Sequence, residues 1–287
     1  MPHSSFAIVD NYLGRLPDAP ASRSSIWRSA DGSVQGRFFA CTLTSEFQPI
    51  HAVGRAAGRQ VAGFEGVARG VSPSDQGVSV WRMLDGASSD HESIALDRLC
   101  RVLHAVNYFR QPAAAEGADL YLSVHDRLLA AVSSNHGDAF LHLLNILELP
   151  QQQIVLQLPA IGPASRWLAN YVADNYRRNG FRLAFAADRV SEAIELVSRF
   201  QPHAVTLDAR ALTHPDALAR LLELAQAADV KVIVKKLETP AALALLEQAC
   251  PLGATILHAQ GDFLDPARPL LQAPHGQAAD APAGCAA

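Results

Sequence analysis

Lysine is scarce in this chain, and no cluster of basic residues replaces it. Only Lys231, Lys235 and Lys236 occur among 287 residues, and the formal net charge is −4. A protein that binds a nucleic-acid backbone needs clustered cations to neutralise the phosphates. The composition therefore argues against a nucleic-acid partner.

Cysteine motifs and long apolar runs are also missing. The four cysteines lie far apart, without a C-x-x-C motif or a paired histidine spacing, so the sequence predicts neither a zinc site nor a disulfide framework. No run approaches the ~18 apolar residues of a membrane span, and the first residues lack the pattern of a secretory signal. We therefore expect a cytoplasmic protein that does not bind a membrane.

The rest of the composition is that of a globular domain. Hydrophobic residues make up 49% of the chain and charged residues 18%, which suits a chain with a large core. Residues 1–40 have little periodicity, and we expect an irregular extension there with one short helix near 6–13. The folded domain is expected over 41–272. Residues 273–287, rich in Ala, Pro and Gly, are expected to form a disordered tail.

Within the folded domain, short apolar runs rich in β-branched residues alternate with longer helical stretches. The expected strands are 46–51, 59–68, 120–124, 154–158, 182–186, 204–207, 231–234 and 255–257. The expected helices are 93–109, 138–147, 164–178, 191–200, 215–228 and 240–250. About eight strands alternating with helices predict an α/β fold closed into a TIM-like (β/α)8 barrel that starts with a hairpin. An open doubly wound sheet is the alternative, although the glycine-rich fingerprint of a dinucleotide fold is absent.

Functional residues of such a barrel lie at the carboxyl ends of its strands. Glu65 is the one carboxylate that the pattern places at a strand end, whereas Asp208 and Glu238 follow their strands. A hydrolytic centre using Mg²⁺ or Mn²⁺ needs several carboxylates that converge on the ions. A single carboxylate with Lys235 as its neighbour is a poor cation site. We therefore predict no metal, no other cofactor and no catalytic residue here.

Several short motifs follow one another in a fixed order along the chain. They are 47–50 (FQPI), 64–69 (FEGVAR), 96–98 (LDR), 122–124 (LSV), 207–208 (LD), 237–239 (LET) and 260–261 (QG). This order resembles the EAL domain, a family of bacterial cyclic di-GMP phosphodiesterases and their inactive relatives. The resemblance runs from about residue 45 to 266 and implies a barrel with an antiparallel first strand.

The resemblance also implies which residues would form the family's metal centre. The Glu-Ala-Leu signature reads Glu65-Gly66-Val67, so its metal-binding carboxylate is kept. The family's other metal-centre positions carry different residues here, namely His125, Gln157, Ala186, Ala187, Thr206 and Lys235. Most of the anionic oxygens are thus lost, together with the lysine that would orient the attacking water. Without them we expect no detectable phosphodiesterase turnover.

A set of residues that could contact a nucleotide is retained. The candidates are Gln48, Glu65, Arg69, Asp97, Glu238 and Gln260. Arg69 could hold a phosphate with its planar fork, and Asp97 could accept hydrogen bonds from a guanine edge. The alternative, which we favour, is that Glu65 pairs with Arg69 or with Lys235 across the barrel mouth.

Two further residues and one loop are considered for metal binding, for nucleophilic chemistry and for partner docking. His125 points toward the family's pocket and is the histidine best placed for a zinc-like ion, although a packing role is favoured. Cys100 lies in an apolar helical stripe, which indicates a core position and not a nucleophile. The loop at 70–89 contains Trp81, which either docks a partner or packs on the barrel.

Together these observations predict a catalytically inactive, EAL-like regulatory protein that acts through a protein partner. The resemblance implies a role in bacterial control of motility, biofilm or virulence. One alternative is a cyclic di-GMP receptor without turnover, and another is a weak cyclic di-GMP phosphodiesterase. Relatives of the family often dimerise through the barrel, so a homodimer is left open.

Overall fold

The computed structural model describes most of the chain between residues 24 and 269. The described residues are 8, 11, 24–30, 32–39, 41–54, 60–71, 89–111, 114, 117–125, 136–160, 162, 166–249 and 256–269. These ranges contain the eight strands of the barrel. The loop that carries Trp81, the tail at 273–287 and most of the short helix expected near 6–13 lie outside the described residues.

Eight strands close into a barrel, as the alternating pattern predicts. They are β3 (Cys41–Ala52), β4 (Val61–Val71), β5 (Asp119–Ser123), β6 (Ile154–Leu158), β7 (Arg182–Ala187), β8 (Ala204–Asp208), β9 (Lys231–Lys235) and β10 (Leu257–Ala259). The sheet runs from β3 through β10 and back along the chain to β4, and pairing of β3 with β4 closes it. Strand β3 is antiparallel to both β4 and β10, whereas the pairs from β4 to β10 are parallel. The expected antiparallel first strand is confirmed.

A small hairpin precedes the barrel, so the prediction of irregular structure does not hold for residues 24–38. Strands β1 (Ser24–Arg28) and β2 (Val34–Phe38) pair with each other, and β2 continues onto β3. The buried positions of β2 alternate with less buried ones, and Gly36 lies directly against the leucines of the next helix. These strands are short, and their core-facing glycine gives no apolar signal, so sequence periodicity does not reveal them.

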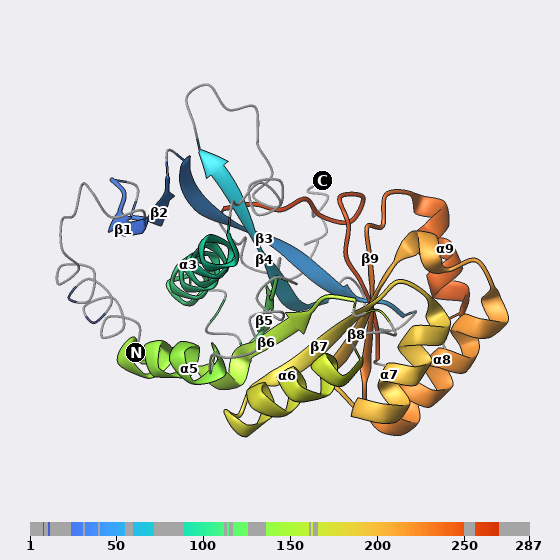
Figure 1. Cartoon of the computed structure of the whole chain (residues 1–287). Helices are drawn as coiled ribbons and strands as arrows, with labels where there is room; N and C mark the ends of the chain where they lie inside the picture. The colour runs from blue at the N-terminus through green and yellow to red at the C-terminus, as the bar shows by residue number, and fades with distance from the viewer. Residues whose placement is uncertain are drawn as a thin grey trace, which may run out of the picture.

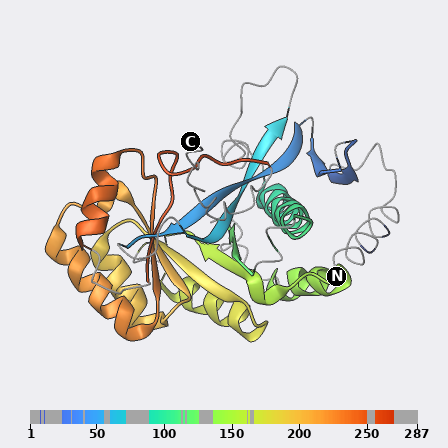
Figure 2. The same ribbon diagram turned by 180° about the vertical axis from the view of Figure 1, so that it is seen from behind.

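Helices cover the outer surface of the barrel (Figures 1 and 2). They are α3 (Asp90–Phe109), α5 (His136–Ile146), α6 (Arg166–Arg178), α7 (Val190–Phe200), α8 (Pro215–Ala228) and α9 (Pro240–Ala249). The long helix α3 lies against the β3–β4 hairpin, while α7, α8 and α9 lie side by side over the later strands. Ser89 caps α3 by accepting a hydrogen bond from the Glu92 amide. None of the described helices has the length and apolar character needed to cross a bilayer.

Alternation along the strands divides the barrel interior into layers. The middle layer is a buried apolar group formed by Ile50, Tyr121, Val155, Ala184, Ala204 and Ile233. Because side chains two residues apart share a face, the inward positions nearer the carboxyl ends of the strands form a polar layer above it. That layer includes Glu65, Ser123, Gln157 and Lys235. The apolar layer separates this polar mouth from the amino end of the barrel.

The amino end of the barrel holds its own charged cluster around Asp119. The Asp119 carboxylate accepts hydrogen bonds from Arg182 at 2.6 Å, His203 at 3.1 Å and Lys231 at 3.2 Å. Burial works to raise the pKa of Asp119, but these donors outweigh it and hold the pKa well below its ordinary value. The cluster therefore links three parallel strands and the residue before β8, which stabilises the end of the barrel opposite the mouth.

Candidate functional site

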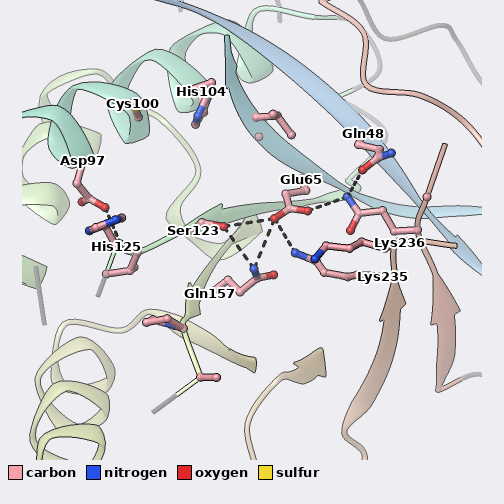
Figure 3. Close-up of a pocket in the computed structure, with 18 of the residues that line it drawn as sticks. Gln48, Glu65, Asp97, Cys100, His104, Ser123, His125, Gln157, Lys235 and Lys236 are labelled. Atoms are coloured by element: carbon pink, nitrogen blue, oxygen red, sulfur yellow. Dashed lines mark hydrogen bonds and ion pairs between the residues drawn. The ribbon is translucent and has the colours of Figure 1, made fainter. Parts of the chain in front are cut away.

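A cavity of about 650 Å³ opens at the carboxyl ends of the strands (Figure 3). Its floor is the polar layer of the barrel, and one wall is the inner side of α3. This is where catalytic and binding groups of an α/β barrel gather, and the volume is that of a small-ligand site. The cavity is therefore the candidate functional site.

Glu65 lies at the centre of the floor and is surrounded by donors. Its Oε1 atom is 2.6 Å from the Lys235 ammonium, and its Oε2 atom accepts a hydrogen bond of 2.8 Å from the Gln260 amide. Ser123 and Gln157 also donate to Oε1, at 3.3 and 3.5 Å (Figure 3). The four donors come from four different strands or strand ends. Closure of the barrel is thus what brings them onto one carboxylate.

The charge of Glu65 is balanced inside the protein. Burial works to raise the pKa of this carboxyl group, but the Lys235 ammonium and the hydrogen bonds of Gln260 and Ser123 outweigh burial and keep the pKa below its ordinary value. Glu65 is therefore ionised at neutral pH, and its negative charge is already paired with an ammonium group.

The residues around Glu65 do not fit a divalent cation. Hard ions such as Mg²⁺ and Mn²⁺ need several anionic oxygens, and here the nearest charged group is a cation. Ala186 and Ala187 bring no donor atom beyond the backbone, and no cluster of three or more His, Cys, Asp or Glu side chains suited to a metal exists among the described residues. An ion bound to Glu65 would lie beside the Lys235 ammonium, which would repel it.

Of the two pairings considered for Glu65, the structure contains the one with Lys235. Arg69 instead bonds to Glu46 at 2.6 Å, with a side chain that is 57% exposed, and it is not among the residues that line the cavity. Arg69 lies four residues after Glu65 on β4, in the part of the strand that extends beyond the barrel mouth. The placement of Arg69 as a phosphate-gripping residue at the cavity is therefore not supported by this conformation.

The other sequence candidates all line the cavity, in different roles. Gln48 donates to Asp262 at 2.9 Å and accepts from Gln260 at 3.1 Å, so these side chains and Glu65 form one hydrogen-bonded row. Glu238 lies exposed at the rim. The structure thus brings Gln48, Glu65 and Gln260 together and leaves Glu238 apart from them.

Asp97 lies on α3 and serves the fold. Its carboxylate is 2.6 Å from the buried guanidinium of Arg101 and accepts a hydrogen bond of 2.9 Å from the backbone amide of His125. Both Asp97 and Arg101 are almost completely buried. The pair ties the end of β5 to α3, which fixes the position of His125 at the cavity edge.

Two cavity residues on α3 were not predicted as site residues. Cys100 and His104 stand one helical turn apart and face the mouth (Figure 3). Burial raises the pKa of the Cys100 thiol well above its usual range, so the thiol stays protonated. His104 bonds to Ser45 at 2.9 Å, and a Cβ atom built on Gly66 would lie 2.8 Å from its ring. The glycine inside strand β4 was the one sequence signal of this close approach.

Comparisons with known proteins agree with the fold. A family model described as the EAL domain matches residues 32–267. No curated protein matches the chain. Among solved structures, the chain is similar to the Bacillus subtilis YkuI protein with an EAL domain, in complex with substrate c-di-GMP and calcium. That match has a TM-score of 0.64 at 16% identity and covers 80% of this chain and 56% of YkuI.

Two other solved structures are similar over most of the chain. The FimX EAL domain from Pseudomonas aeruginosa bound to c-di-GMP has a TM-score of 0.60 at 15% identity, and the match covers 94% of this chain and 98% of that EAL-domain chain. Klebsiella pneumoniae BlrP1, in a manganese and cyclic di-GMP complex, has a TM-score of 0.59 at 18% identity. That match covers 88% of this chain and 62% of BlrP1. At these identities the likeness concerns the fold.

Replacing Lys235 tests the energetic role of the ion pair. Lys235→Met leaves the Glu65 carboxylate buried without its counterion, so we expect the free energy of unfolding to fall by about 1–3 kcal/mol. In the double variant Glu65→Gln/Lys235→Met no charge is left unpaired, and the loss is expected to be smaller than the sum of the single losses by about 1–2 kcal/mol. Urea denaturation of Lys235→Met, Glu65→Gln and the double variant measures the three losses in the free energy of unfolding.

Lys236→Met is the matched control, because Lys236 pairs with Asp208 on the surface with a 61% exposed side chain. Its loss should stay within about 1 kcal/mol. Additive effects of the two single changes at Glu65 and Lys235 would contradict the coupling.

His104 gives the fold a dependence on pH. Burial lowers the pKa of His104 to about 4, from an ordinary value of 6.5. Between these values the unfolded chain binds a proton that the folded chain does not, so stability falls as the pH drops from about 6.5 to about 4. His258, also with a pKa lowered to about 4, adds to the same loss.

His104→Gln should therefore reduce the loss of stability between pH 7 and pH 4 by roughly 1–3 kcal/mol, measured by urea denaturation at a series of pH values. The exposed His214, replaced by Gln, is the control and should leave the pH profile unchanged. An identical pH profile for His104→Gln and the unaltered protein would show that the ring is not held neutral.

Proposed function

Because the chain belongs to the EAL domain family, we propose that it is a non-hydrolytic member that acts as a cytoplasmic regulatory protein through a protein partner. The observation that carries the proposal is the 2.6 Å contact between Lys235 and Glu65 at the centre of the barrel mouth. Metal-assisted hydrolysis of a phosphodiester needs an ion to activate water and a base to take its proton. In this cavity the central carboxylate is neutralised by an ammonium group, and the neighbouring positions carry amide, hydroxyl or methyl groups.

The family context supports a signalling role. Two of the proteins of similar fold, YkuI and the FimX EAL domain, were solved in complex with c-di-GMP. The resemblance in motifs suggests bacterial control of motility, biofilm or virulence. The chain keeps the closed barrel and an open mouth, while the described residues of the cavity offer one central carboxylate that is already paired with Lys235. A scaffold kept in this form can still present a surface and a pocket to another protein, which supports a role in binding.

Binding of cyclic di-GMP without turnover is the second candidate function. It is favoured by the hydrogen-bonded row of Gln48, Glu65 and Gln260, which lines a cavity of suitable size. It is disfavoured by the position of Arg69, which pairs with Glu46 outside the cavity lining. We therefore place it second to a protein partner.

Incubation of the full chain with cyclic di-GMP and Mg²⁺ or Mn²⁺ tests the loss of turnover. We expect no linear dinucleotide above the protein-free background by chromatography, because no described group in the cavity both holds an ion and accepts a proton. A hydrolytically active EAL phosphodiesterase in the same buffer is the positive control. Product that increases with protein concentration, and that Glu65→Gln abolishes, would refute the proposal.

A further inference from the structure

We propose that the cavity at the barrel mouth binds an arginine side chain of the protein partner. This inference rests on the proposed function and adds the chemistry that the partner must present. It follows from three properties of the lining residues, namely their charge balance, their unused hydrogen-bond acceptors and the apolar part of the wall.

Negative charge exceeds positive charge among the described lining residues. The carboxylates are those of Glu65, Asp97, Glu238 and Asp262, of which Asp97 is paired with the buried Arg101, and the ammonium groups are those of Lys235 and Lys236. Lys235 is paired with Glu65, and Lys236 lies at the rim, 3.0 Å from the Asp208 carboxylate that it shares with Arg210. Glu238 and Asp262 are exposed and form no ion pair with a described residue. These two exposed carboxylates therefore favour a positively charged group at the rim, away from the Lys235–Glu65 pair on the floor.

Unused hydrogen-bond acceptors lie in the floor of the same cavity. The amide nitrogens of Gln157 and Gln260 both donate to Glu65, which fixes the orientation of the two amides. Their Oε1 atoms are then left buried without a donor among the described residues, and the side chains are only 9% and 1% exposed. An unpaired buried acceptor costs free energy that an incoming N–H group recovers. The cavity thus favours a ligand that carries N–H donors as well as positive charge.

A guanidinium group meets both needs better than a phosphate-bearing nucleotide does. It carries five N–H donors and a permanent charge in a planar fork that suits carboxylates and amide oxygens. The aliphatic stem can pack on the apolar wall, which Val67, Val124 and Pro159 help to form. A guanine base also offers N–H donors, but the phosphates of the nucleotide would meet the exposed carboxylates of Glu238 and Asp262.

Calorimetry with the full chain tests the inference, using a pentapeptide of alternating glycine and arginine. The matched peptide carries citrulline in place of both arginines, which keeps the shape and removes the charge. We expect the arginine peptide to bind at least about tenfold more tightly than the citrulline peptide, and binding to weaken with added salt. The double variant Glu238→Gln/Asp262→Asn should weaken arginine-peptide binding by about tenfold.

Glu223→Gln, a change of the same kind on the outer face of α8, is the control and should leave the affinity unchanged. Equal binding of the two peptides, no binding of either, or equal affinity for the double variant and the unaltered chain would overturn the inference. Cyclic di-GMP binding at lower concentration than the peptide would assign the cavity to the nucleotide. Each of these results leaves the absence of turnover untouched, because the hydrolysis assay decides that separately.

Discussion

The contact between Glu65 and Lys235 organises the mouth of the barrel. A carboxylate placed in a mostly buried position must be paired, either with an external cation or with a charged group of the protein. In this chain the pairing is internal, at 2.6 Å, and three further donors complete the hydrogen bonding of the carboxylate. The orientation of the Gln157 and Gln260 amides, which both donate to Glu65, follows from that arrangement.

An internal counterion changes what the cavity can do. A metal ion would polarise a substrate and activate water, whereas a lysine held by a carboxylate neutralises charge without supplying either function. The same arrangement directs the amide nitrogens of Gln157 and Gln260 to Glu65 and leaves their oxygens without a donor among the residues that the structure describes. In the proposal made above, these oxygens would accept hydrogen bonds from a group that brings N–H donors.

Much of this architecture could be predicted from the sequence, because strand and helix periodicity is local. The barrel, its antiparallel first strand and the central position of Glu65 follow from short motifs and their order. The choice between Arg69 and Lys235 as partner of Glu65 could not be made, since it depends on how far β4 extends past the mouth. The β1–β2 hairpin and the contact of His104 with Gly66 were missed, because both depend on packing against α3 that no linear pattern records.

The central claim is that Lys235 takes the place of a cation beside Glu65. Electron paramagnetic resonance of Mn²⁺ titrated into the full chain tests it most directly, because the signal separates free from bound ions. The account predicts that the addition of protein leaves the spectrum of free Mn²⁺ unchanged. One equivalent of bound Mn²⁺ that Glu65→Gln abolishes would contradict it.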